Sequence, residues 1–193
     1  MTDTTSPRGL LIQTAFDLLE RQGYNGTGLN QIIEESKTPK GSLYHYFPGG
    51  KEELFVAAVE VKKQKMAQLV QTALASSQDT ATAFQNFFKR IGKALEECGY
   101  RSGGAVASIT LETSGSSEQL QKACETAYEE LRQLFEDKLR EAGLAPNRAY
   151  ALSLVIGSAV EGATVICRAQ RNSIAITETG KAVAQLIRAE LSA

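Results

Sequence analysis

Apolar residues recur every three or four positions along most of the chain, which is the spacing of one face of an α-helix. A first stripe begins near Leu11 and is closed by Gly23, and Ile32 and Ile33 anchor a short second stripe. Alternating patterns typical of strands are nearly absent, with residues 173–177 as one weak candidate. We therefore expect an all-α protein of about eight or nine helices.

The stretch from Arg148 to Arg171 is apolar or small on almost every face, and Glu161 is the one charge in its central part. A helix that is hydrophobic all round has to be buried all round. This one is too rich in small polar residues to favour a membrane span. The last helix, expected over residues 180–191, carries a similar stripe. Two such helices from each of two chains would form a four-helix dimer interface; the alternative is one central helix in a monomeric bundle.

Charge is nearly balanced over the whole chain but not along it. The 21 basic and 22 acidic residues give a net charge of −1, so no global field attracts nucleic acid or an acidic membrane. Residues 36–51, in contrast, contain Lys37, Lys40 and Lys51, the chain's single histidine, and no acidic residue. Any nucleic-acid partner would therefore bind a local patch.

The N-terminal sequence lacks the charged-then-apolar pattern of a signal peptide, and no apolar run reaches the roughly 18 residues of a membrane span. Cys98, Cys124 and Cys167 are widely spaced and form no C-x-x-C pair. These features predict a cytoplasmic protein that does not bind a membrane. Each cysteine is either a small buried hydrophobe or a thiol that senses a ligand or an oxidant.

The segment from residue 27 to residue 47 predicts two helices joined by a short turn. The first would run from about Gly28 to Glu35, and the second from Pro39 to about Tyr46. Thr38 is expected to cap the second helix, with Pro39 at its first position, where a missing N–H has no cost. Leu43 and Phe47, four residues apart, would face the core. The remaining faces are polar and aromatic without acid, which is typical of the second helix of a helix-turn-helix.

Each residue type on these faces suits DNA. Lysines neutralise phosphates or bind guanine, hydroxyls bond to phosphates or base edges, and tyrosine rings contact thymine methyl groups. Glycine allows the backbone to approach closely, and the helix beginning after Pro48 offers N-terminal amides to a phosphate. The alternative is a solvated polar surface. The predicted DNA contacts are Thr27, Lys37, Thr38, Lys40, Gly41, Ser42, Tyr44, His45, Tyr46 and Lys51.

The stretch GYNGTGLNQIIEESKTPKGSLYHYFPGGKEEL resembles the DNA-binding domain of the TetR/AcrR family of repressors, over about the first third of the chain. The doubled Gly49-Gly50 and the later GGAVASITLET resemble the LmrA/YxaF branch of that family. The family pattern falls here on Thr27, Ile32, Gly41, Leu43, Tyr44, Phe47, Lys51, Glu52 and Leu54. The resemblance implies a homodimer, a palindromic operator on double-stranded DNA, and a ligand pocket in the C-terminal helices that controls DNA affinity.

We therefore expect residues 1–50 to form an N-terminal three-helix helix-turn-helix domain. Residues 51–193 would form a larger C-terminal helical domain for ligand binding and dimerisation through the last two helices. A helix over about 51–76 would link the two. Pockets for amphipathic molecules combine aromatic rings with isolated polar groups. The candidate ligand residues are Met66, Phe84, Phe88, Glu112, Tyr128 and Glu161, each of which has a core or structural role as its alternative.

The expected function is a ligand-responsive DNA-binding regulator, a repressor, and the resemblance implies that a small lipophilic or aromatic effector releases it from its operator. Since the chain has one histidine and no nucleophile motif, we expect no catalytic residue. No metal site or cofactor is expected either. Two alternatives remain open: a helical small-molecule carrier or enzyme without DNA function, and a DNA-binding protein without an effector.

Overall fold

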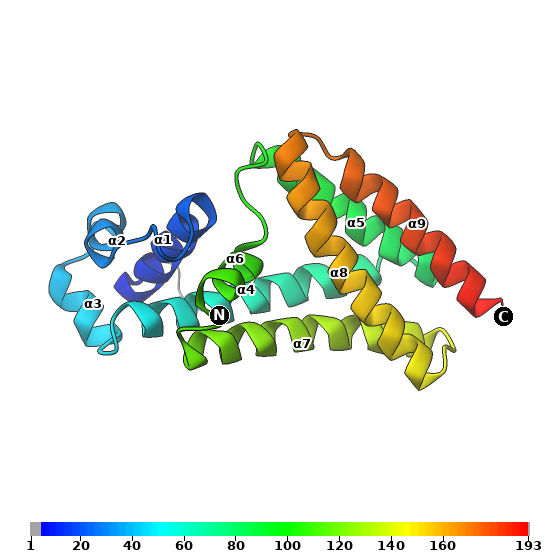
Figure 1. The fold of residues 1–193 in the computed structure, drawn as a ribbon, viewed down its shortest axis with the longest axis horizontal. Coiled ribbons are helices and arrows are strands. Elements are labelled where there is room, and N and C mark those ends of the chain that lie inside the picture. The colour runs from blue at the N-terminus through cyan, green and yellow to red at the C-terminus, as the bar shows by residue number, and fades with distance from the viewer. Residues whose placement is uncertain (1–4, 193) are drawn as a thin grey trace. The chain divides into compact units, whose positions relative to one another are not determined.

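The computed structural model describes residues 5–192, and within that range the chain forms nine helices and no strand. Residues 1–4 belong to the N-terminal sequence for which no signal peptide is expected. They lie outside the described range, as does residue 193. The all-α prediction is confirmed. The helices are α1 (Pro7–Gln22), α2 (Leu29–Ser36), α3 (Lys40–Tyr46), α4 (Lys51–Leu74), α5 (Thr80–Glu97), α6 (Ala105–Thr113), α7 (Glu118–Glu141), α8 (Pro146–Gln170) and α9 (Ile174–Leu191) (Figure 1).

The weak strand candidate at residues 173–177 is wrong, because this segment forms the start of α9. Ile176 is completely buried whereas Ile174 is exposed, and the buried positions continue as Gly180 and Val183 at helical spacing. A Cβ added to Gly180 would lie 2.5 Å from the Cβ of Phe88. Glycine thus allows α9 to pack closely on α5, and this tertiary contact outweighs the β propensity of two isoleucines.

The chain folds into two compact packing units. The N-terminal unit contains residues up to 64 and residues 104–127, and the C-terminal unit contains residues 65–103 and 128–193. Each has its own hydrophobic core. Helix α6 and the first part of α7 thus pack with the N-terminal helices, although they are distant in sequence. The boundary predicted after residue 50 separates a DNA-binding domain from a ligand-binding domain by function and not by packing, and it stays a prediction.

In the N-terminal unit, α1 is well delimited. The N–H of Gly9 donates to the Ser6 hydroxyl, which caps the helix, and Gly23 ends it with φ 78°. The core of this unit buries Leu43 and Phe47, as predicted. Tyr46 also packs partly against this core, whereas Lys40, Gly41, Tyr44 and His45 of α3 are exposed.

In the C-terminal unit, α9 packs against α5 and α8, and the Phe135 ring contacts those of Phe84 and Phe87 in the core. Helix α8 is long and apolar enough to cross a membrane by length and composition alone, with a mean hydropathy of 1.6 over its most apolar window. Core helices of soluble proteins pass the same test. Only 33% of that window is buried within the chain, so α8 is not covered on all sides by its own unit.

Candidate nucleic-acid interface

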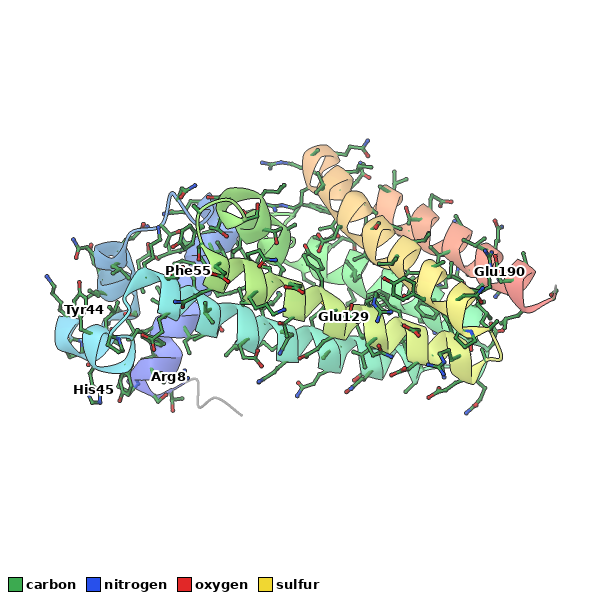
Figure 2. The ribbon with its side chains drawn as sticks, turned by 60° about the horizontal axis from the view of Figure 1, so that its bottom comes forward. Arg8, Tyr44, His45, Phe55, Glu129 and Glu190 are labelled. Carbon is green, nitrogen blue, oxygen red and sulfur yellow. The ribbon has the colours of Figure 1, made fainter. Side chains whose placement is uncertain are left out.

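Helix α3 presents a polar and aromatic surface. Tyr44 is 47% exposed, and Lys40, Gly41 and His45 are exposed as well, whereas Ser42 and Tyr46 are partly buried. The His45 and Tyr46 rings meet edge to face, with centroids 4.9 Å apart. Figure 2 shows Tyr44 and His45 projecting from this helix. The surface thus combines a cation, hydrogen-bonding rings and an accessible backbone.

Gly41 and Lys37 shape this surface through their backbone. A Cβ added at Gly41 would meet nothing within 4 Å, so the fold itself does not need glycine there. Lys37 ends α2 in the left-handed conformation, with φ 54°, and its N–H donates to the carbonyl of Glu34. A lysine in this conformation is uncommon, and it places an exposed cation at the turn between the two helices.

Thr27 and Thr38 do not belong to the exposed surface. Thr27 is completely buried, and its hydroxyl donates to the Gly23 carbonyl at 2.7 Å. Thr38 is 7% exposed, and its hydroxyl lies 2.8 Å from that of Ser36. The predicted cap is also wrong: α3 begins at Lys40 with Pro39 before it and without a side-chain cap. The two threonine hydroxyls therefore stabilise the turns internally, in place of the predicted DNA contacts.

Polar groups at and just before the start of α4 form more bonds within the protein than the sequence led us to expect. The Lys51 ammonium donates to the Tyr24 carbonyl at 2.6 Å and lies 4.2 Å from the centroid of the Tyr24 ring. Partial burial lowers the pKa of Lys51, although the nearby Glu112 carboxylate opposes this shift. The N–H of Gly49 donates to the Glu53 carboxylate at 2.8 Å. Part of the predicted phosphate-binding end is thus satisfied within the protein.

Arg8 is a residue that the sequence reasoning missed. It lies in the first turn of α1, is exposed, and has its guanidinium 5.4 Å from the centroid of the Phe47 ring, directly after α3 (Figure 2). No local pattern signals this, because the two residues are far apart in sequence. The contact brings another cation to the end of α3.

Glu112, predicted to bind a ligand, belongs to the N-terminal unit. Its carboxylate accepts hydrogen bonds from the N–H groups of Tyr24 and Asn25, at 3.1 and 2.8 Å, and from the Ser108 hydroxyl at 2.9 Å. These three internal donors already use most of the acceptor sites of the carboxylate, and the ligand role of Glu112 stays a prediction.

The other candidate ligand residues lie in the C-terminal unit. Phe84 and Phe88 are completely buried, and Met66 packs against the same core. The Tyr128 hydroxyl donates to the Glu161 carboxylate at 3.1 Å. Burial raises the pKa of Glu161, and the hydrogen bond from Tyr128 opposes this rise. The structure thus brings together one polar pair and, separately, a set of core side chains.

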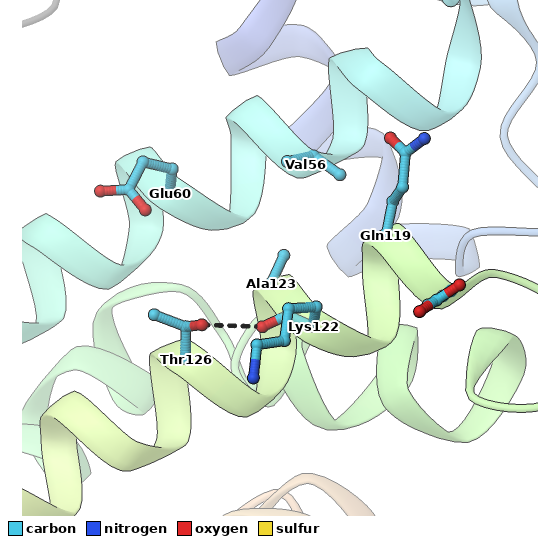
Figure 3. Close-up of a pocket in the computed structure, with 7 residues that line it drawn as sticks. Val56, Glu60, Gln119, Lys122, Ala123 and Thr126 are labelled. Carbon is cyan, nitrogen blue, oxygen red and sulfur yellow. Dashed lines mark hydrogen bonds between the residues drawn. The ribbon is translucent and has the colours of Figure 1, made fainter.

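An open pocket of about 510 Å³ lies elsewhere, in the N-terminal unit between α4 and α7 (Figure 3). None of the six candidate ligand residues lines it. It is lined by Val56, Glu60, Glu118, Gln119, Lys122, Ala123 and Thr126. The wide opening and mixed charge do not resemble an enclosed apolar site for a lipophilic compound.

Models of known families match both parts of the chain. The model of the bacterial regulatory proteins of the tetR family matches residues 11–58, and the C-terminal domain model of LmrA/YxaF-like transcriptional regulators matches residues 80–182. The HTH-type transcriptional regulator LmrA of Bacillus subtilis (strain 168) is 36% identical, over 94% of this chain and 96% of the relative. The chain belongs to the TetR family.

A second relative places this TetR-family protein in the LmrA/YxaF-like group. The uncharacterized HTH-type regulator YxaF of Bacillus subtilis is 34% identical, over 97% of this chain and 98% of the relative. The crystal structure of the regulatory protein TetR from Rhodobacter sphaeroides shares the fold, with a TM-score of 0.83 at 21% identity over 91% of this chain and 96% of that chain. These relatives are transcriptional regulators and not enzymes. Helices α2 and α3 are accordingly the DNA-binding helix-turn-helix of a transcriptional regulator.

The three cysteines of this TetR-family chain differ in their surroundings. Cys124 and Cys167 are free and buried, and Cys98 is free and partly buried. Within residues 5–192, no group of three or more histidine, cysteine or acidic side chains could hold a metal ion.

Proposed function

We propose that this TetR-family regulator is a homodimeric repressor that binds a palindromic operator and leaves it when a small lipophilic or aromatic effector binds. The exposed surface of α3, with Lys40, Gly41 and Tyr44 and without an acidic side chain, is the observation that carries the DNA part. Repression follows simply, because a protein bound at a promoter competes with polymerase for the same DNA.

The proposed contacts divide by type. Lys37, Lys40 and the Arg8 guanidinium neutralise phosphates, together with Lys51, whose ammonium has three N–H donors and uses one on Tyr24. Tyr44 is the foremost candidate for a base contact because its ring and hydroxyl are both accessible. The remaining proposed contacts are Gly41, Ser42, His45 and Tyr46.

Dimerisation is supported by apolar side chains that a single chain leaves exposed. On α8, Leu154, Val155 and Val165 are 46%, 50% and 59% exposed, which is unusual for so apolar a helix. On α9, Leu186 and Leu191 are both 40% exposed. Pairing α8 and α9 with the same helices of a second chain would bury these side chains and provide two α3 helices for two operator half-sites.

For the effector, the C-terminal unit offers the Tyr128–Glu161 pair and a core rich in phenylalanine. A ligand with an apolar body and one hydrogen-bond donor or positive charge suits such a site. An effector dissociates the complex only if it binds better to a conformation that does not fit the operator. Since the partner is chromosomal DNA, the proposed location is the cytoplasm.

The test is fluorescence anisotropy with labelled DNA tiles from upstream of this protein's own gene and its neighbours. We expect one tile that contains an inverted repeat to bind much more tightly than scrambled duplex at physiological salt. Compounds that raise the melting temperature of the protein are then tested for release of that tile. A protein that binds compounds tightly but prefers no tile, and that does not bind random DNA at low salt, would instead be a small-molecule carrier.

A further inference from the structure

The loop between α1 and α2, residues 23–28, is held by two elements that are distant in sequence and lie in the same packing unit. Glu112 of α6 binds its N–H groups, and Lys51 at the start of α4 binds one of its carbonyl oxygens. The Glu112 carboxylate thus accepts from two N–H groups of this loop, and the Lys51 ammonium donates to a carbonyl of the same loop. We call this arrangement of Glu112, Lys51 and residues 23–25 the loop clamp.

The carboxylate makes an unusually complete set of bonds for a partly buried side chain. Oε1 accepts from Tyr24 N and from the Ser108 hydroxyl, and Oε2 accepts from Asn25 N at 2.8 Å. Partial burial would raise the pKa of Glu112, but the bonds from Asn25, Ser108 and Tyr24 and the charge of Lys51 lower it. Glu112 is therefore ionised at neutral pH, and charge-assisted bonds of this kind are stronger than neutral ones.

Gly23 makes the close approach possible. Its φ of +78° lies in the region that favours glycine, and an added Cβ would lie 2.5 Å from Oε1 of Glu112. The Gly23 carbonyl also accepts the buried Thr27 hydroxyl at 2.7 Å. Thr27 directly precedes Gly28, the N-cap of α2, and α2 leads through the Lys37 turn into α3.

We propose that Glu112 is a positioning residue for the DNA-reading helices: it sets the conformation of the α1–α2 loop, and through it the orientation of α2 and α3. This inference rests on the proposed DNA-binding function. It assigns to α6, which the C-terminal family model covers, a direct bond to the segment that the N-terminal model covers. A shift of α6 that breaks the two N–H bonds would release the loop and lower operator affinity without any change at the DNA-facing side chains.

The first measurement is hydrogen exchange of the Tyr24 and Asn25 amides, with no DNA present. Glu112→Gln is the informative variant, because the N–H groups of Tyr24 and Asn25 bind different oxygens and the side-chain amide replaces one of these acceptors with a donor. We expect exchange to accelerate by about twofold to tenfold, which corresponds to one net hydrogen bond. Ser108→Ala, which leaves both N–H bonds in place, should have a smaller effect. Glu118→Gln, an exposed carboxylate in the same unit, is the control.

The second measurement is DNA affinity, with the tile that wild type binds or with random duplex at low salt. It is made well below the melting temperature of each variant, where a simple loss of stability has no effect on the folded fraction. Glu112→Gln should weaken binding by a similar factor and leave the salt dependence unchanged, since no phosphate contact is lost. Unchanged amide exchange, or faster exchange with unchanged affinity, would each overturn the proposal. Wild type that binds no tile would count against the operator function alone, because the exchange measurement does not depend on it.

Discussion

The ammonium of Lys51 donates a hydrogen bond to the carbonyl oxygen of Tyr24, 27 residues earlier in the chain, and also lies over the Tyr24 ring. A lysine at the start of a helix behind the reading helix would ordinarily be assigned to a phosphate. Here it also fastens α4 to the α1–α2 loop. We therefore assign two roles to Lys51, a contact with a DNA phosphate and a bond to the loop. Experiments can separate them, because the first changes the salt dependence of DNA binding and the second changes the free energy of unfolding.

Lys51→Met removes the charge and keeps most of the side chain's length. We expect the salt slope of DNA binding to fall by about one unit per half-site. We also expect the free energy of unfolding to fall by about 1–2 kcal/mol, through loss of the bond to Tyr24 and of the contact with its ring. Titrations at several salt concentrations and urea unfolding measure the two effects. Lys93→Met, which removes an exposed cation from α5 in the other packing unit, controls for net charge. A salt slope of the Lys51→Met variant identical to that of wild type would restrict Lys51 to the loop.

Tyr44→Ala tests the reading helix itself. Since Tyr44 is half exposed, truncation should change the free energy of unfolding by no more than about 0.5 kcal/mol. Binding to the operator should weaken by about 1–3 kcal/mol per half-site, and discrimination against scrambled DNA should shrink. Tyr44→Phe separates the hydroxyl from the ring. If the alanine variant folds and keeps full operator affinity, α3 does not read DNA through this side chain.

Gly41→Ala separates the needs of the fold from those of the DNA. Because a Cβ at Gly41 meets nothing within 4 Å and alanine favours helix, we expect stability to rise by up to about 1 kcal/mol. Operator affinity should fall if the α3 backbone approaches DNA closely at this point, as we propose. Gly115→Ala, at another open glycine, should leave affinity unchanged. Equal affinities for wild type and Gly41→Ala would contradict the close approach.

Leu154→Glu tests the dimer through α8. This leucine is 46% exposed in the single chain, so the charge should be tolerated by the fold but not by a buried interface. We expect sedimentation or light scattering to show a monomer at concentrations where wild type is dimeric. Leu111→Glu is the matched control, because Leu111 on α6 is 85% exposed and is not part of the proposed interface. A dimer that survives Leu154→Glu would place the interface elsewhere.

Glu161→Gln makes a prediction about pH. Burial raises the pKa of Glu161, so the folded protein holds this proton at a pH where the unfolded chain has lost it. Wild-type stability should therefore decline as pH rises from the ordinary glutamate value through the raised value, and it should stay lower above that window. The glutamine variant does not titrate at this position and should be more stable than wild type at neutral pH. Melting temperatures across pH measure the difference; a difference that does not vary with pH would contradict it.

The reading helix could be predicted because its signals are local. Leu43 and Phe47 are four residues apart and both are buried, and Gly23 closes α1 with a positive φ, as the pattern indicated. The hydroxyls of Thr27 and Thr38 were misassigned because sequence shows that a residue is polar but not where its side chain points. Their bonds to Gly23 and Ser36 depend on how the turns close.

Sequence by itself determined the helical class, the family and the helix-turn-helix segment, because helical periodicity and the spacing of Gly41, Leu43 and Tyr44 are properties of neighbouring residues. Tertiary structure decided what Glu112, Lys51 and Arg8 do. Their partners lie far away along the chain, so only the packing of α6, α4 and α1 brings the charges to them. A carboxylate that looked available for a ligand is thereby committed to two backbone N–H groups, because a partly buried charge is stable only when it is bonded.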